Sequence, residues 1–106
     1  MQPQGHVQVL VNIIDYGMNL QEAGDAARFN HDGGRHPTSV DGDPLGTLYV
    51  EPGVSPATRE KLTAMGHTVE VSDTGSGFGG YQAIMRQGDT WVGATEMRKD
   101  GTVAAY

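Results

Sequence analysis

The segment from residue 6 to residue 16 limits the possible folds more than any other part of the sequence. Its apolar residues recur at helical spacing, so it predicts a helix that is apolar over most of its circumference. Gly17 follows at a position suited to the left-handed residue that ends a helix. Such a helix needs cover on more than one side, because an exposed apolar stripe is an association surface. One stripe contains Val7, Leu10, Val11 and Ile14, and the other contains Val9, Ile13 and Tyr16.

Capping signals predict two further helices. Residues 19–22 read Asn-Leu-Gln-Glu, the pattern of a capping box, and predict a short helix over residues 20–27. Ser55 followed by Pro56 predicts the start of a helix of about ten residues, and Gly66 is suited to its C-terminal end.

Strands and loops complete a predicted α+β fold. A hairpin is predicted from residues 81–86 and 90–94 across the Gln-Gly-Asp turn between them. Further strands are predicted at residues 47–50, 67–71 and 102–106, and surface loops at residues 31–44 and 75–80. We therefore expect helices packed on a mostly antiparallel sheet, within a single domain over residues 1–106.

Composition excludes several classes of function. The chain has 106 residues, with 7 Lys and Arg against 13 Asp and Glu, and its formal net charge is −6. No nucleic-acid partner is expected, because sequence-independent binding of nucleic acid needs a basic surface. No membrane span is expected either, since no apolar run approaches about 18 residues, and the first six residues do not predict a signal peptide. The absence of cysteine excludes disulfides and thiolate metal sites.

Residues 75–80, Gly-Ser-Gly-Phe-Gly-Gly, match the text pattern of a dinucleotide-binding loop. That function requires a helix N-terminus directly after the loop, because the helix end holds the pyrophosphate. The following residues 81–85 have a strand pattern instead. We therefore expect a glycine loop that enters a sheet, and no cofactor.

The remaining polar residues do not form a recognisable active site. The histidines and aspartates of the loop at residues 31–44 match no zinc spacing, so no metal is expected. No G-x-S-x-G elbow presents a serine nucleophile, and the early carboxylates fit capping or solvated positions. Arg28 and Arg98 are expected to form internal ion pairs, while His6 and His67 are isolated. The candidate site residues are His31, Asp32, His36, Asp41 and Asp43 for a metal, Ser39, Ser72 and Ser76 for a nucleophile, and Asp15, Glu22 and Asp25 for acid–base chemistry.

Segments along almost the whole chain match one family pattern in order. Residues 11–23 read Val-Asn-Ile-Ile-Asp-Tyr-Gly-Met-Asn-Leu-Gln-Glu-Ala, and residues 27–31 read Ala-Arg-Phe-Asn-His, similar to an A-P-R-F-x-H stretch. The chain resembles the γ-glutamyltransferase (γ-glutamyltranspeptidase) family. It departs from the family pattern at Ala26-Ala27-Arg28, where small-Pro-Arg is usual, and at Glu96-Met97-Arg98, where Asp-Pro-Arg is common. Further matches are residues 48–51, 65–67, 80–84 and 93–95, Arg98, Gly101 and the terminal Ala105-Tyr106.

The resemblance implies part of an N-terminal-nucleophile-type αββα sandwich. In that family a precursor cleaves itself into large and small subunits, and the threonine exposed by this cleavage attacks the γ-glutamyl amide with its own α-amine as base. This chain resembles the C-terminal portion of the small subunit. The threonine, the residues that hold the glutamate and the oxyanion glycine pair lie upstream of that portion. The resemblance therefore assigns no catalytic, cofactor-binding or metal-binding residue to this chain.

These observations lead to two main functional expectations. The first is a C-terminal fragment of a γ-glutamyltransferase-like enzyme, which transfers or hydrolyses γ-glutamyl groups of glutathione-type substrates and is inactive alone. The alternative is a non-catalytic, stand-alone module for binding or self-assembly; a small metal- or ligand-binding protein using residues 31–44 is the least favoured. The expected partner is the missing upstream half of the enzyme or a second copy that buries the helix at residues 6–16, and the γ-glutamyl substrate binds only the complete protein.

Overall fold

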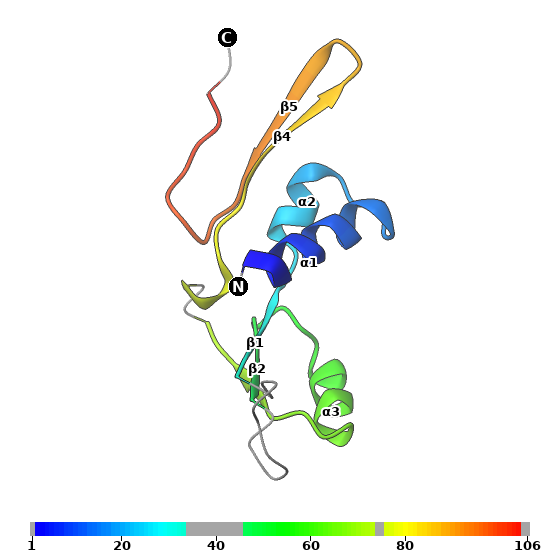
Figure 1. The fold of residues 1–106 in the computed structure, drawn as a ribbon, viewed down its shortest axis with the longest axis vertical. Coiled ribbons are helices and arrows are strands. Elements are labelled where there is room, and N and C mark those ends of the chain that lie inside the picture. The colour runs from blue at the N-terminus through cyan, green and yellow to red at the C-terminus, as the bar shows by residue number, and fades with distance from the viewer. Residues whose placement is uncertain (1, 34–45, 74–75, 105–106) are drawn as a thin grey trace, which may run out of the picture. The chain divides into compact units, whose positions relative to one another are not determined.

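The computed structural model describes residues 2–33, 46–73 and 76–104 (Figure 1). The chain divides into two compact units, of which one contains residues 1–26 and 75–106 and the other contains residues 27–74. Unit 1 is thus discontinuous in sequence, whereas unit 2 is one uninterrupted segment. Units of this kind also occur within one domain, so the single domain over residues 1–106 stays a prediction.

Unit 1 is built from two helices and a hairpin. The helices are α1 (Gln2–Ile14) and α2 (Leu20–Asp25), and a 3-10 turn, η1 (Ser76–Phe78), precedes strands β4 (Gln82–Gln87) and β5 (Thr90–Thr95). The strands pair antiparallel from Gln82↔Thr95 to Gln87↔Thr90, as predicted, and Gly88 in the turn has a φ of 60°. Helix α2 contacts α1 and both strands of the hairpin.

The start of α2 follows from local sequence. The Asn19 side chain accepts a hydrogen bond of 2.8 Å from the backbone amide of Glu22, and the Glu22 carboxylate in turn accepts one from the Asn19 amide group. The first contact satisfies a backbone donor that a helix N-terminus otherwise leaves unpaired, which confirms Asn19 as the predicted cap. Glu22 bonds the Asn19 side chain, whereas in a capping box it would bond the Asn19 backbone amide. Gly17, with a φ of 66°, separates α1 from α2 in the conformation that glycine adopts most readily.

The core of unit 1 lies where α2 meets the hairpin. Leu20, Tyr81 and Ala94 are buried there, and the Tyr81 hydroxyl donates a hydrogen bond of 2.8 Å to the Leu20 carbonyl. Gly24 is required by this contact, because a Cβ at this position would overlap the Tyr81 ring. The partly buried residues packed around this core are Val9, Ile13, Ala83, Met85 and Val92.

The two apolar stripes of α1 have different surroundings. Val9 and Ile13, from one predicted stripe, pack against the core of unit 1. Val7, Leu10 and Ile14, from the other, are 60%, 54% and 73% exposed. The described residues therefore cover one side of α1, and its second apolar side is exposed, as expected for the association surface that the sequence predicts.

Unit 2 contains a three-stranded sheet and one helix. Its strands are β1 (Phe29–Asp32), β2 (Thr47–Val50) and β3 (Val69–Val71), in the order β1-β2-β3, and its helix is α3 (Pro56–Ala64). Strands β1 and β2 are antiparallel, whereas β2 and β3 are parallel, with α3 in the connection between them. Ser55 caps α3 by accepting a hydrogen bond of 3.2 Å from the Thr58 amide, as the sequence predicts.

Several predicted boundaries need correction. Helix α1 begins at Gln2 rather than residue 6, and α2 ends at Asp25 rather than residue 27. Residues 31 and 32, expected in a loop, form the end of β1 because they pair with Leu48 and Thr47 on β2. Residues 102–104 form no strand, since Val103 packs with its side chain over Gly93 instead of joining the sheet. Among the described residues, no helix is both long enough and apolar enough to cross a bilayer.

Candidate functional site

The structure does not gather the predicted acid–base or metal candidates into one site. Glu22 belongs to the cap of α2, and the Asp25 carboxylate accepts a hydrogen bond of 3.0 Å from Gln21 one turn earlier. In residues 2–33, 46–73 and 76–104, no three His, Cys, Asp or Glu residues lie together in a way that could hold a metal ion. Four candidates, His36, Ser39, Asp41 and Asp43, lie outside the described residues.

Arg98 forms an ion pair, as the sequence predicts. The Arg98 Nη1 atom lies 3.0 Å from the Glu96 carboxylate, and both side chains are buried. The Arg98 guanidinium also donates hydrogen bonds of 2.9 Å to the Gly24 carbonyl and 3.0 Å to the Ala26 carbonyl. We call this arrangement the Glu96–Arg98 clasp, because it joins the chain after β5 to the C-terminal end of α2.

The charge of Glu96 is stabilised despite its burial. Burial acts to raise the pKa of this carboxyl group, but hydrogen bonds from the Arg98 amide, the Arg98 side chain and the Tyr81 amide outweigh it, together with the charge of Arg98. The Lys99 amide donates a further hydrogen bond of 3.1 Å. The net result is a pKa below the ordinary value of 4.5, so the clasp is a charged pair near neutral pH.

Arg28 occupies a different environment. It is 4% exposed, its backbone amide donates a hydrogen bond of 2.8 Å to the Glu51 carboxylate, and its carbonyl accepts one of 3.0 Å from the Glu51 amide. These bonds extend the pairing of β1 with β2 by one step beyond Phe29↔Val50. An ion pair of the Arg28 side chain stays a prediction.

One face of the sheet in unit 2 is apolar and carries a histidine. The register places Phe29, Val50 and Val71 side by side across the three strands, and His31, Leu48 and Val69 in the next row. Residues directly opposite each other in a sheet point to the same face, so these six side chains share one face. The neighbours Asn30, Tyr49 and Glu70 alternate to the other face.

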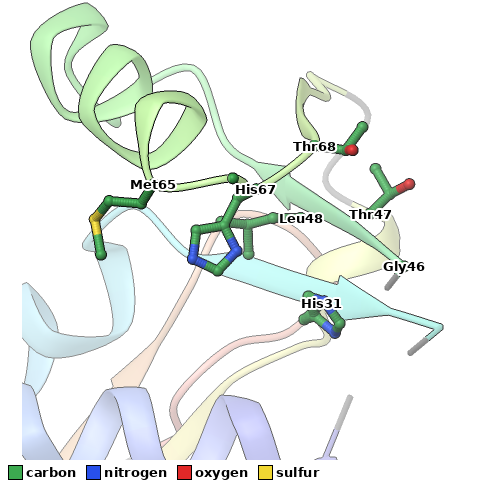
Figure 2. A pocket seen from close by; sticks show the side chains of 8 residues that line it. His31, Gly46, Thr47, Leu48, Met65, His67 and Thr68 are labelled. Carbon is green, nitrogen blue, oxygen red and sulfur yellow. The ribbon is translucent and has the colours of Figure 1, made fainter. Parts of the chain in front are cut away.

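Two hollows of about 530 and 540 Å³ lie along this face. The first is bounded by apolar residues of the sheet and by Thr58 and Leu62, one turn apart on α3. The second is bounded by Thr47, Thr68 and Met65 (Figure 2). His31, Leu48 and His67 line both hollows, which therefore adjoin each other.

The structure brings His31 and His67 to the same hollows, which the sequence does not predict. The sequence predicts a loop at His31 and an isolated His67, because the two residues are far apart in the chain. The signal that could have joined them is the parallel pairing of β2 with β3, which aligns the approach to β3 with the start of β2. Figure 2 shows both imidazoles beside the sheet, one on β1 and one ahead of β3.

Comparison with solved structures defines the class of fold. The cephalosporin acylase from Bacillus halodurans matches with a TM-score of 0.78 at 36% identity, over 98% of this chain and 18% of that chain. The gamma-glutamyltranspeptidase from Pseudomonas nitroreducens complexed with L-DON matches with a TM-score of 0.74 at 26% identity, over 96% of this chain and 48% of that chain. The α+β fold, as part of an N-terminal-nucleophile-type structure, is confirmed.

Comparison of sequences defines the family. The sequence model of the gamma-glutamyltranspeptidase family matches residues 1–106, so the chain belongs to that family. Two relatives are each 36% identical to it: the acylase ACY 1 proenzyme of Pseudomonas sp. (strain SE83), over 93% of this chain, and the glutathione hydrolase proenzyme of Escherichia coli (strain K12), over 94%. The chain spans 15% of the length of each relative.

Proposed function

We propose that this chain acts as the C-terminal portion of a γ-glutamyltransferase-like enzyme and contributes to γ-glutamyl transfer or hydrolysis only together with an upstream portion. The observation that supports this most directly is a family match over residues 1–106 combined with coverage of 15% of two proenzymes. The resemblance assigns the nucleophilic threonine and the oxyanion glycines to the upstream portion. The chain alone is therefore expected to be inactive.

The exposed stripe of α1 is the surface through which the two portions would join. Val7, Leu10 and Ile14 lie along one side of α1 and are each more than half exposed. An apolar stripe of this kind is costly in water and typical of an interface. A chain of this size has a small free energy of unfolding, and a contact at this stripe would increase it. The contact would leave the packing of Val9 and Ile13, on the other side of α1, unchanged.

Complementation tests the proposal. The glutathione hydrolase proenzyme of Escherichia coli, shortened by the 102 residues that align with this chain, is produced with and without it, and hydrolysis of a γ-glutamyl anilide is followed by release of the coloured amine. Activity is expected only when both parts are present. Leu10→Asp is expected to reduce the restored activity about tenfold or more, whereas Gln8→Asp, which adds the same charge on the polar side of α1, leaves it within about twofold.

Two further results bear on this proposal. The coding sequence read in frame upstream of residue 1 is expected to contain a Gly-Gly pair and, further upstream, a threonine at a cleavage site. No restored activity with any upstream partner, in a mixture where both parts are folded and soluble, would contradict the proposal.

The same stripe supports the second candidate function, a non-catalytic module that self-associates. A two-fold dimer through α1 would bury Val7, Leu10 and Ile14 against their copies, because a two-fold interface pairs a surface with itself. Sedimentation of the chain at tens of micromolar, an order-of-magnitude concentration, distinguishes the candidates. Dimers that Leu10→Asp dissociates favour self-assembly, and a monomer at all concentrations contradicts it.

A further inference from the structure

We infer that the two adjoining hollows beside His31 and His67 bind a small molecule with an apolar chain and one carboxylate group. The inference concerns unit 2 alone and does not depend on the proposed enzyme activity. Ligand sites in proteins are typically hollows of about 300–1,000 Å³ with mostly apolar walls and a few polar groups that orient the ligand. The two hollows together have this character, with the apolar and the polar parts at opposite ends.

The apolar end suits a hydrocarbon chain or ring. Its floor is the sheet face made by Phe29, Leu48 and Val50, of which Phe29 is 44% exposed. Its side is formed by α3, where Leu62 is half-buried. A ligand that removes this apolar surface from water gains about 25 cal/mol for each Å² covered.

The polar end suits a carboxylate. Imidazole N–H groups can donate hydrogen bonds, and His31 and His67 line this end. The residues that line the two hollows include no Asp, Glu, Lys or Arg among the described part of the chain. Asp32, the nearest acid in sequence to His31, alternates to the other face of the sheet. An anionic head group therefore meets donors and no opposing carboxylate, whereas an amine meets no acid.

Titration of the full chain with decanoate, below its micelle concentration, tests this inference. Backbone amide shifts in two-dimensional NMR are expected to change at residues 29–31, 48–50 and 58–67. Decanol has the same chain without the charge, and decylamine has the opposite charge. Decanoate is expected to bind about fivefold or more tightly than decanol, and decylamine more weakly than either.

Variants separate the two ends of the site. His31→Leu combined with His67→Leu removes both donors and is expected to weaken decanoate binding about fivefold and to leave decanol binding within about twofold. His67 is exposed, so His67→Leu alone is a safe second variant, and His6→Leu on α1 is the matched control that leaves both affinities unchanged.

Three results would overturn the inference. One is unchanged decanoate affinity in the folded double histidine variant. Another is a set of shifts confined to Val7, Leu10 and Ile14, which would indicate binding to the exposed stripe of α1 instead. The third is a set of shifts at the hollows that follows protein concentration and not decanoate, which would identify a second copy of the chain as the occupant.

Discussion

Glu96 has a side chain that is both buried and negatively charged. Its carboxylate is closed to water and accepts hydrogen bonds from the amides of Arg98 and Lys99 and from the Arg98 guanidinium. Arg98 in turn satisfies the carbonyls of Gly24 and Ala26, which the end of α2 leaves without helical partners. The Arg98 guanidinium therefore both neutralises Glu96 and caps the C-terminal end of α2.

Removing the charge of Glu96 is expected to destabilise the chain strongly. Glu96→Gln keeps the shape of the side chain but leaves a buried guanidinium without its counter-charge, which typically costs about 3–5 kcal/mol. The free energy of unfolding, measured by urea denaturation, checks this value. Met97→Gln is the matched control, since Met97 lies between the two residues and is 82% exposed, and it is expected to change stability by less than about 0.5 kcal/mol.

The clasp also predicts a dependence of stability on pH. Because folding lowers the pKa of Glu96, its contribution is complete above the ordinary value of 4.5 and is lost as the pH falls through the lower value of the folded state. The free energy of unfolding is therefore expected to decrease between about pH 5 and pH 3. The difference between the chain and Glu96→Gln over this range isolates Glu96 from the other carboxyl groups. A constant difference would contradict the prediction.

At the scale of elements, α1 shows how one helix can serve two surfaces. Ile13 and Ile14 are adjacent residues of α1 with the same side chain, yet Ile13 packs on the core of unit 1 and Ile14 is 73% exposed. The difference comes from helical geometry, because consecutive residues point about 100° apart around the axis. One side of α1 therefore holds the unit together while the other remains available.

This difference is directly measurable. Ile13→Ala is expected to lower the free energy of unfolding by about 1–3 kcal/mol, because it removes buried methyl groups at a partly buried position. Ile14→Ala is expected to change it by less than about 0.5 kcal/mol. Urea denaturation under conditions where the chain is monomeric checks both values. Equal losses would show that α1 does not pack as the structure has it.

Elements defined by local signals could be predicted from the sequence, and those defined by distant pairing could not. The caps at Asn19 and Ser55 and the hairpin turn at Gly88 depend on a few neighbouring residues, so their patterns are visible in the sequence. Strand β1 exists because it pairs with β2 across a long connection, and its residues 31 and 32 have the composition of a loop. The meeting of His31 with His67 depends on the same pairing, so it was missed for the same reason.

The ion pair predicted for Arg98 is present, but its partner differs from the family pattern. The family pattern has an aspartate two residues before the arginine, and this chain has Glu96 in its place. The longer side chain still reaches the Arg98 guanidinium at 3.0 Å. The sequence therefore predicts an ion pair at Arg98 but not its partner, and the two α2 carbonyls that complete the clasp depend on tertiary structure.

At the scale of the whole molecule, the two units allow different parts of the chain to open separately. Val50, 1% exposed, belongs to the core of unit 2, and the Glu96–Arg98 clasp belongs to unit 1. Proteins commonly open in contiguous cooperative units that differ in stability. The division therefore predicts that a destabilising substitution in one unit increases local unfolding mainly in that unit.

Hydrogen exchange of backbone amides tests this prediction. Glu96→Gln is expected to accelerate exchange in α2, β4 and β5 more than in β1 and β2, and Val50→Ala is expected to do the reverse. Both variants are compared with the unaltered chain under native conditions. Uniform acceleration throughout the chain in either variant would indicate a single cooperative unit.

The discontinuity of unit 1 has a consequence for synthesis on the ribosome. Helices α1 and α2 emerge first, but the hairpin that packs against them and the arginine that completes α2 emerge only after all of unit 2. Unit 2 is one continuous segment and can fold in that interval. Until then the side of α1 that carries Val9 and Ile13 lacks the hairpin that packs beside it, which leaves this apolar surface open to chaperones. The residues made last therefore determine whether the residues made first keep their structure.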